Sequence, residues 1–285
     1  MENNSIDLPL LKNNKPHISY SEVSEWHSCP WRHKLSYIDK VLNSEPSPHL
    51  NYGTILHDAV ENFMNGNSID VESASQKIRD AWTLHGFDSC EFIEKQTKRA
   101  ESQGWKYRHS DVNVWINSAK NCLEQLGSFL DEKFPGWKPV AAEHELYEKI
   151  DTSQVGIYKG YIDCIIELPN GKHVIIDWKT SGPRGWNADK RNDFLVQAQL
   201  ILYKNFWMRK SGKTSSQVKT IFILLKRESK PGKSLDFVEV SSGPKAVEKA
   251  NKLVTSMIRG MQSGFVVKNK MSCKFCDFAN TQYCT

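Results

Sequence analysis

The chain has 285 residues, of which 39% are hydrophobic and 25% charged, as in an ordinary globular protein with one sizeable core. The net charge of +5 permits a polyanionic partner without requiring one. Residues 1–15 lack the basic start and apolar centre of a signal peptide, and no apolar run approaches the roughly 20 residues that cross a bilayer. We therefore expect no membrane association and a cytoplasmic protein, whose cysteines stay reduced unless a metal holds them.

The N-terminal third is predicted to be mainly helical. Residues 1–17 are polar and carry no pattern of regular structure. A helix is expected from Ser19, which can cap it, until Pro30 interrupts the pattern. The proline and serine content of 44–53 predicts a loop.

A second helical region follows that loop. Apolar residues at helical spacing from Ile55 predict a helix that ends at Gly66. Residues 66–138 are mostly helical in pattern and are interpreted as a helical insertion. They carry no cluster of residues that points to chemistry.

The pattern changes to β-type alternation near residue 140. Strands are predicted over 140–150, 156–168 and 172–180, the last two forming a hairpin. The remaining predicted elements are a helix over 194–210, strands over 220–228 and 234–240, and a helix over 243–264. This order predicts an α/β fold with a central mixed β-sheet flanked by helices.

The length of the hairpin loop decides which side chains share a face. A two-residue Asn-Gly turn would put Asp163 and Asp177 on opposite faces. A three-residue loop, from Pro169 to Gly171, sets the two carboxylates opposite each other and puts Lys179 on the same face as Asp177. The flanking pairs in that register are Ile165 with Ile175 and Glu167 with His173.

Opposed carboxylates at the end of a hairpin need a compensating charge. They repel each other by up to about 1 kcal/mol even on an exposed sheet. Carboxylate oxygens suit Mg²⁺ or Mn²⁺, and an ammonium beside such an ion can support a water nucleophile. The alternative is a surface salt bridge in which Lys179 simply neutralises an aspartate.

An ordered set of residues around this hairpin resembles the PD-(D/E)XK nuclease superfamily. The resemblance is closest to its RecB-like branch of AddB-type and CRISPR-associated exonucleases. The matching positions, in the family's order, are His57 in YGTILHDAVENF, Asp163 in GYIDCI, Asp177 and Lys179 in IDWKTSG, and Gln199 and Tyr203 in QLILY. The resemblance implies a restriction-endonuclease-like core and an Mg²⁺- or Mn²⁺-dependent deoxyribonuclease spanning 1–285 as a single domain.

The resemblance also implies a role for each matching residue. Asp163, Asp177 and Lys179 would be catalytic, with Lys179 serving the water nucleophile. The metal ligands would be both aspartates, His57 and the backbone carbonyl of Trp178.

Further residues are implied at the edge of the site. Gln199 and Tyr203, four apart on one helix face, would line the site or contact the DNA backbone. Family members often carry an additional glutamate before the first aspartate. Either Glu143 or Glu145 could be that residue, and the sequence does not choose between them.

Four cysteines lie near the two ends of the chain. Cys273 and Cys276 form a C-x-x-C motif, Cys284 follows, and Cys29 lies far upstream. Thiolates at such spacing suit zinc or an iron–sulfur cluster. The resemblance implies a [4Fe–4S] cluster that clasps the tail, residues 270–285, to the Cys29 region. Zinc and unliganded thiols are the alternatives.

The predicted function is an exonuclease acting on single-stranded DNA or duplex ends in recombination, repair or replication. The size and the lack of a motor motif predict a stand-alone nuclease of a bacterium, archaeon or virus. The SGKT stretch at 211–214 lacks the upstream glycine of a phosphate-binding loop, so a helicase or other partner would separate strands. Competing hypotheses are a catalytically inactive DNA-binding or assembly subunit and a zinc-stapled protein without an iron–sulfur cluster. Basic residues on loops beside the predicted site could neutralise phosphates: Arg184, Lys190, Arg191, Lys226, Arg227 and Lys230.

Overall fold

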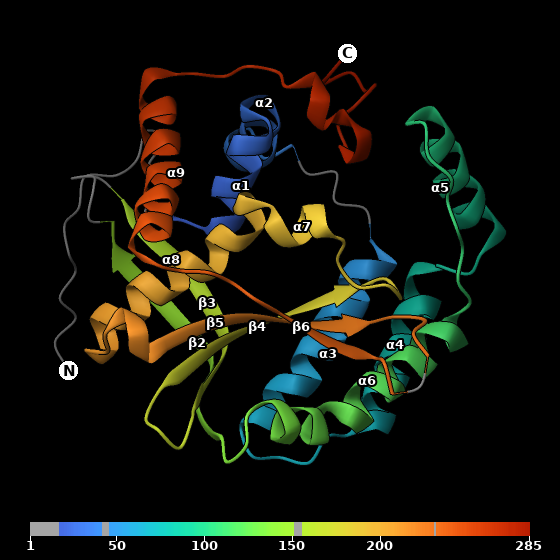
Figure 1. The fold of residues 1–285 in the computed structure, drawn as a ribbon. Helices are drawn as coiled ribbons and strands as arrows, with labels where there is room; N and C mark the ends of the chain where they lie inside the picture. The colour runs from blue at the N-terminus through green and yellow to red at the C-terminus, as the bar shows by residue number, and fades with distance from the viewer. Residues whose placement is uncertain (1–16, 42–45, 151–155, 231) are drawn as a thin grey trace, which may run out of the picture. The chain divides into compact units, whose positions relative to one another are not determined.

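A computed structural model describes residues 17–41, 46–150, 156–230 and 232–285. The chain folds into two compact units, each built from separate chain segments. We call Glu45–His144 with Ile162–Ser242 the sheet unit. We call Met1–Ser44, Glu145–Tyr161 and Gly243–Thr285 the terminal unit, because it contains both ends of the chain. Figure 1 shows the elements of both units coloured along the chain.

The strands of the sheet unit form the predicted mixed sheet. β4 (His173–Ser181) pairs parallel with β5 (Val218–Lys226) along its whole length. β3 (Ile157–Glu167) pairs antiparallel with β4, and β6 (Leu235–Glu239) pairs antiparallel with β5. These strands are rich in isoleucine, valine and leucine, which suits strands covered on both faces.

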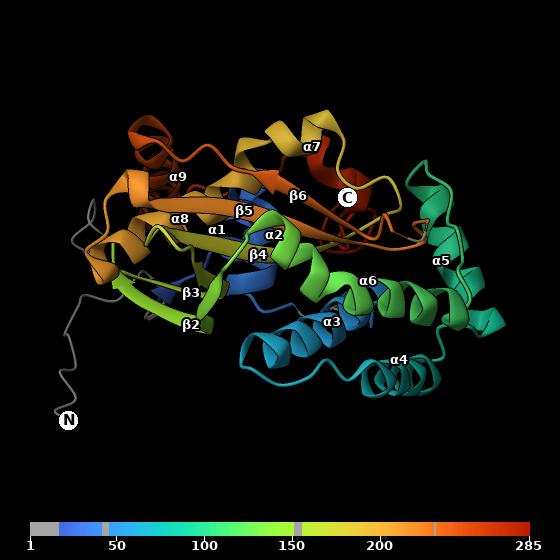
Figure 2. The same cartoon turned by 60° about the horizontal axis from the view of Figure 1, so that its bottom comes forward.

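Helices cover both faces of these strands. On one face, alternate side chains of β4 and β5 join a core with α3 (Pro48–Met64) and α6 (Val112–Lys133). The opposite face packs against α8 (Phe194–Ser211). The other helices of this unit are α4 (Val71–His85), α5 (Cys90–Ser102) and α7 (Ala188–Asn192). Figure 2 shows α3, α4 and α6 grouped together on one side of the strands.

The hairpin between β3 and β4 has the predicted three-residue loop. The Leu168 N–H donates to the Lys172 carbonyl at 2.8 Å, and Gly171 adopts a left-handed φ of +73°. Ile165 pairs with Ile175 and Glu167 with His173, as predicted. The last recorded pair is Cys164 with Ile176, so Asp163 and Asp177 occupy the next position along the two strands.

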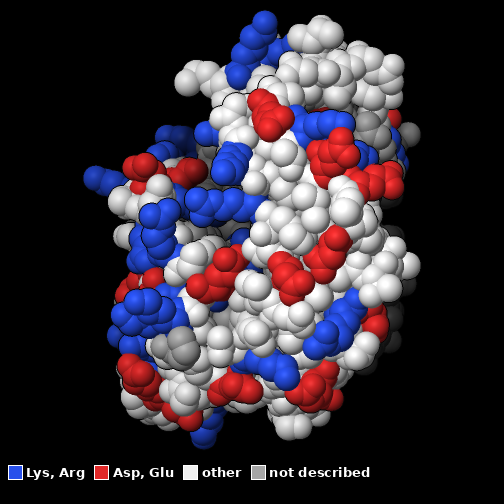
Figure 3. Space-filling view, turned by 90° about the vertical axis from the view of Figure 1, so that its right-hand side faces the viewer, with Lys and Arg blue, Asp and Glu red and all other residues white. Residues whose placement is uncertain are grey.

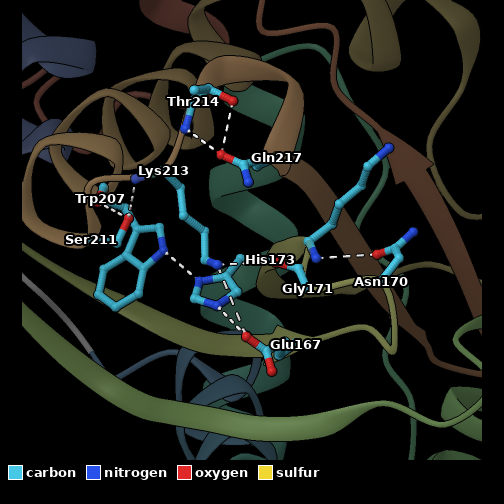
Figure 4. A network of polar contacts seen from close by, with 10 residues as sticks. Glu167, Asn170, Gly171, His173, Trp207, Ser211, Lys213, Thr214 and Gln217 are labelled. Carbon is cyan, nitrogen blue, oxygen red and sulfur yellow. Dashed lines mark hydrogen bonds and ion pairs between the residues drawn. The ribbon is translucent and has the colours of Figure 1, made fainter.

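A partly buried polar network links the turn end of this hairpin to α8 and the segment after it, as Figure 4 shows. The Trp207 indole N–H donates to His173 Nδ1 at 3.0 Å, and His173 Nε2 lies 3.1 Å from Glu167 Oε2. Lys213 Nζ donates to the Gly171 carbonyl at 3.0 Å. These contacts from α8 and the segment after it stabilise the turn and thereby the register of β3 with β4. That register sets the positions of Asp163 and Asp177 at the opposite end of the hairpin.

The terminal unit consists of helices from both chain ends and a short strand. β1 (His17–Ile18) pairs parallel with the start of β3. α1 (Tyr20–Ser28) begins as predicted after Ser19, whose side chain accepts the Glu22 N–H at 3.3 Å. The remaining elements are α2 (Pro30–His33), a π-helical turn (Lys34–Ile38), α9 (Pro244–Ser263) and a 3₁₀ segment (Lys270–Phe275). β2 (Lys138–Lys149) pairs with β3, and both strands contribute residues to each unit.

Close packing in the terminal unit requires a glycine. A Cβ at Gly260 would lie 2.2 Å from Cζ2 of Trp26, so only glycine lets α9 approach α1 this closely. His27 Nε2 lies 2.8 Å from the Leu253 carbonyl and adds a polar link between the same helices. α1 and α9 are therefore joined by specific contacts.

Two stretches expected to be loops contain helices. α3 begins at Pro48, inside the stretch 44–53, because proline fits the first turn of a helix, where its missing N–H has no partner to lose. α7 begins after Asn187, whose side chain accepts the Lys190 N–H. The expectation for 1–17 falls largely outside the described residues; His17 itself is in β1. Throughout the described parts of the chain, the helices are too short or too polar to cross a bilayer.

Candidate metal and active site

The end of β4 presents its charges on one face and an aromatic residue on the other. Asp177 is fully buried, and the Lys179 side chain is 34% exposed. Trp178, between them, is buried in the core that β4 forms with α3 and α6. A strand that alternates in this way carries a polar pair at its edge while it keeps its packing on the other face.

Three ligand-type side chains converge beside this pair. One ligand atom each of His57, Glu143 and Asp163 lies within 4.8 Å of the other two, the one such group found among the described residues. His57 comes from α3, Glu143 from β2 and Asp163 from β3, and all three are half-buried. His57 Nδ1 is 3.6 Å from Asp163 Oδ2. The structure thus joins two of the predicted metal ligands and adds one of the two candidate glutamates.

The Asp163 carboxylate is held in place at an energetic cost. Its Oδ2 accepts the backbone N–H of Trp178 at 2.9 Å. Burial raises the pKa of Asp163 well above its usual value, and the nearby Asp177 raises that pKa further. Lys179 and the Trp178 N–H oppose this rise only in part. A carboxylate with such a raised pKa binds a cation favourably, because the cation stabilises its charged form.

Asp177 and Lys179 form a close pair. Lys179 Nζ lies 2.6 Å from Asp177 Oδ2, and Asp177 Oδ1 has no hydrogen-bond partner in the described structure. Burial lowers the pKa of Lys179, but the carboxylates of Asp177 and Asp163 outweigh burial, so that pKa lies above its usual value. Lys179 is therefore an ammonium at neutral pH, and Asp177 keeps one free oxygen.

The two candidate glutamates have different surroundings. Glu143 has a left-handed φ of +45° within β2, a conformation that is costly for a residue with a side chain. Burial raises the pKa of Glu143, and the charges of Glu61 and Asp177 add to that effect. Glu145, two residues on, belongs to the terminal unit and pairs there with Lys159 at 3.2 Å and with the Tyr161 hydroxyl at 3.1 Å.

His57 is set up as a neutral imidazole. Burial lowers its pKa, while the charge of Asp177 and a hydrogen bond with the Trp178 backbone counteract this in part. Neutral imidazole is the form that binds metal ions. The same hydrogen bond places the Trp178 backbone, predicted to contribute a ligand, next to His57.

Gln199 and Tyr203 of α8 lie where the predicted helix face puts them. Gln199 Nε2 donates to the Tyr203 hydroxyl at 3.1 Å. Burial and the charge of Asp177 raise the pKa of Tyr203, so this neutral side chain lies within the field of the acidic group. Tyr203 therefore lies near Asp177, on the helix that packs against β4 and β5.

The four cysteines line one cavity in the terminal unit. Cys29, Cys273, Cys276 and Cys284 border a space of about 260 Å³. The Asn269 N–H donates to Cys29 Sγ at 3.3 Å. The Trp31 indole donates to the Tyr283 carbonyl at 3.0 Å, which ties the N-terminal segment to the tail. The tail and the Cys29 region therefore adjoin each other.

The donor set of the sheet unit fits a hard divalent cation. One imidazole nitrogen and carboxylate oxygens are ligands that Mg²⁺ and Mn²⁺ accept, and no thiolate lies among them. Burial and neighbouring carboxylates raise the pKa values of Asp163 and Glu143, so a cation at the site would stabilise their charged forms. Surface charge is mixed: on the face in Figure 3, lysine and arginine side chains are interspersed with acidic ones.

Comparisons with known proteins agree with this architecture. A crystal structure of a candidate exonuclease from Eubacterium rectale aligns with a TM-score of 0.54 at 12% identity, over 97% of this chain and 92% of that one. The crystal structure of SSO0001 aligns with a TM-score of 0.41 at 15% identity, over 92% and 84%. The first likeness shows a shared fold.

A curated relative and a family model match the sequence itself. The Gene 69 protein of Mycobacterium phage D29 is 24% identical over 178 residues, which cover 59% of this chain and 63% of that protein. The chain thus matches less than two thirds of that relative's length. The family model for the PD-(D/E)XK nuclease superfamily matches residues 17–282. The chain belongs to the PD-(D/E)XK nuclease superfamily.

Proposed function

We propose that the chain is a divalent-metal-dependent DNA nuclease, specifically an exonuclease of the RecB-like branch that acts in recombination, repair or replication. The convergence of His57, Glu143 and Asp163 within 4.8 Å supports this proposal most strongly. The Asp177–Lys179 pair on the adjoining strand adds the acid and the ammonium that the superfamily's name denotes.

The metal would be held by the converging group. His57, Glu143 and Asp163 supply the close ligands, and Asp177 supplies its free Oδ1 from the neighbouring strand. When bound, Mg²⁺ or Mn²⁺ withdraws charge from the phosphate and lowers the pKa of a water. The buried carboxylates provide the negative charge that retains the ion.

Lys179 acts as a cation in this proposal. Because its pKa is raised, Lys179 stays protonated. Its ammonium then donates a hydrogen bond to the attacking water or to a phosphate oxygen. It also balances the negative charge that accumulates as water adds to phosphorus and the P–O ester bond breaks. Gln199 and Tyr203 of α8 are hydrogen-bonded to each other. In this proposal they border the path of the DNA strand.

The cysteine cavity is proposed to hold a [4Fe–4S] cluster. A tetrahedral zinc site with bonds of about 2.3 Å requires its sulfurs to lie roughly 3.8 Å apart. The cysteines line one cavity, but among the described residues no three of their sulfurs lie within 4.8 Å of one another. A cluster of irons and sulfides is larger than one ion, and its cysteine sulfurs lie farther apart than those around a single zinc ion. The Asn269 N–H directed at Cys29 Sγ suits a thiolate ligand.

Cleavage of end-labelled DNA tests the enzymatic proposal. Purified protein is incubated with single-stranded and blunt duplex substrates in Mn²⁺, Mg²⁺ or EDTA, and products are resolved on sequencing gels. We expect metal-dependent release of nucleotides or short products from ends. Metal binding without any cleavage would instead support the inactive DNA-binding subunit.

A matched pair of lysine variants makes the assay specific. Lys179→Ala removes the ammonium at the site, whereas Lys210→Ala removes an exposed charge near the far end of α8. We expect cleavage by Lys210→Ala and none by Lys179→Ala. Equal activity of both variants would contradict the assignment of Lys179.

A further inference from the structure

A cavity opens within the sheet unit just beyond the candidate active site. It has a volume of about 580 Å³ and is bordered by Ser181 at the end of β4, by Arg184 and Trp186 in the following loop, and by Lys190 of α7. Ser181 lies two residues after Lys179, hence on the same face of the strand and about 7 Å farther along it. Consecutive phosphates of a nucleic-acid strand are separated by a comparable distance, so a strand cleaved at the site would extend along this direction.

The wall of the cavity is fixed by contacts within the sheet unit. Arg191 binds Asp236 of β6 at 2.8 Å and donates from Nε to the Trp186 carbonyl at 2.9 Å. The centre of the Trp186 ring lies 5.0 Å from that of Phe222 in β5, and only 6% of Trp186 is exposed. Gly185 turns the loop with a φ of +68°. The loop thus presents a defined surface.

The cations that border this cavity lack ion-pair partners. Among the described residues, neither Arg184 nor Lys190 has a carboxylate within the 4.0 Å of an ion pair. Lys190 Nζ lies 4.9 Å above the Trp186 ring. Burial lowers the pKa of Lys190, and the charge of Lys179 lowers this pKa further. The carboxylate of Asp193 raises the pKa of Lys190, but by less. The two ammonium groups therefore repel each other, and an anion between them would relieve that repulsion.

The Trp186 side chain supports the cavity wall from below. Its indole Nε1 is inaccessible to solvent and has no hydrogen-bond partner in the described structure. Its ring borders the cavity and lies under Lys190 Nζ. A ligand rich in oxygen acceptors suits this wall because two cations border it.

We propose that this cavity binds a phosphate of the nucleic-acid strand next to the phosphate that is cleaved, with Arg184 and Lys190 as its ligands. The inference rests on the proposed nuclease function and adds a positioning subsite to it. Held there, the phosphate fixes the register of the strand over Asp163 and Lys179. The shared chemistry is a phosphate ester, either inside a strand or at its end.

Salt-dependent DNA binding tests the subsite without any cleavage. Fluorescence anisotropy in EDTA measures the affinity of the full chain for a labelled single-stranded oligonucleotide over a series of salt concentrations. Arg184→Gln/Lys190→Gln should bind about tenfold more weakly and reduce the salt slope by about 0.7, because one phosphate fewer is neutralised. Lys210→Ala, which removes a charge outside the cavity, should keep the wild-type slope. A double variant with the slope of Lys210→Ala overturns the proposal, as does a wild type that does not bind.

Further variants and substrates make the result unambiguous. Melting curves establish that each variant is folded, and the single variants Arg184→Gln and Lys190→Gln repeat the test if the pair unfolds. Lys190→Arg, which keeps the charge, should retain the slope. Oligonucleotides with and without a terminal phosphate separate the two sources: an equal loss assigns a phosphate within the strand, and a loss confined to phosphorylated ends assigns the end. A slope change in a protein that never cleaves DNA would support the subsite while refuting the nuclease activity.

Discussion

The acidic site of the sheet unit and the cysteine cavity of the terminal unit are built from different kinds of structure. The acidic site takes its side chains from the regular elements α3, β2 and β3, which bring one ligand-type atom each of His57, Glu143 and Asp163 within 4.8 Å of one another. The cysteine cavity takes its thiols from the residue before α2 and from a tail of 3₁₀ and turn structure.

This difference has an energetic consequence. In the acidic site the fold buries carboxylates and brings like charges together before any ion binds. Burial and this repulsion raise the pKa values of Asp163 and Glu143, and metal binding would offset both effects. The cysteine cavity is lined by thiols together with Arg32, Lys268 and Lys270, and a group bound there would contribute to holding the tail. We therefore expect metal to activate the sheet unit and a cluster to stabilise the terminal unit.

The largest expected effect is on catalysis in the sheet unit. Lys179→Ala should lower the cleavage rate by about 100- to 1,000-fold, since it removes a preorganised positive charge from the transition state. Its melting temperature should also fall, because the fully buried Asp177 carboxylate loses its ion-pair partner. Thermal melting measures the stability, and single-turnover cleavage is measured well below the melting temperature of the variant. Wild-type cleavage by folded Lys179→Ala would contradict the catalytic assignment.

The next largest effect separates the two glutamates. Glu143→Gln should reduce metal affinity and cleavage by about 10- to 100-fold, whereas Glu145→Gln should leave both within about twofold. The reason is that Glu143 converges with His57 and Asp163, while Glu145 pairs with Lys159 and Tyr161. Titration with Mn²⁺ and cleavage rates provide the measurement. The reverse order would move the site to the other glutamate.

Substitution of a cysteine in the cavity should change mainly the stability of the protein and its absorption of visible light. Anaerobically purified wild type should contain iron and inorganic sulfide in equal amounts and absorb visible light. Cys276→Ser should lose both and make the tail sensitive to protease. Cys90→Ser, at an exposed position in α5, is the matched control and should behave as wild type. Zinc with no iron in the wild type would refute the cluster.

The smallest effect is a gain in stability. The pKa of Asp163 is higher in the folded state than in the unfolded state. At pH values between the two, the folded state therefore binds more protons, and the free energy of unfolding falls as pH rises. Metal-free Asp163→Asn should therefore be more stable than wild type at pH 7 by about 1 kcal/mol, with the difference vanishing toward pH 4. Mn²⁺ should stabilise wild type and not this variant. Denaturant melts at several pH values measure the difference, and a variant less stable at pH 7 would contradict it.

Local sequence rules were sufficient for the hairpin. The Pro-Asn-Gly loop fixes its own length through the left-handed Gly171, and the register of Ile165 with Ile175 follows directly. Local rules were insufficient at Pro48, where the same residue type that marks loops also begins helices.

Other features of the site depend on interactions that no local pattern contains. Glu143 and Glu145 lie two apart and share a strand face under ideal alternation, so periodicity could not separate them. The left-handed backbone of Glu143 breaks that alternation. Likewise, Arg191 is paired only because Asp236, 45 residues away, reaches it, whereas Lys190 beside it has no such partner among the described residues. Those long-range pairings decide which cations are available to a phosphate.

Anomalous diffraction from crystals grown with Mn²⁺ would test the central claim most directly. We predict a manganese peak coordinated by His57, Glu143 and Asp163, with Asp177 on the same ion. A peak elsewhere, or an acidic site that stays without manganese at saturating concentrations, would contradict the account.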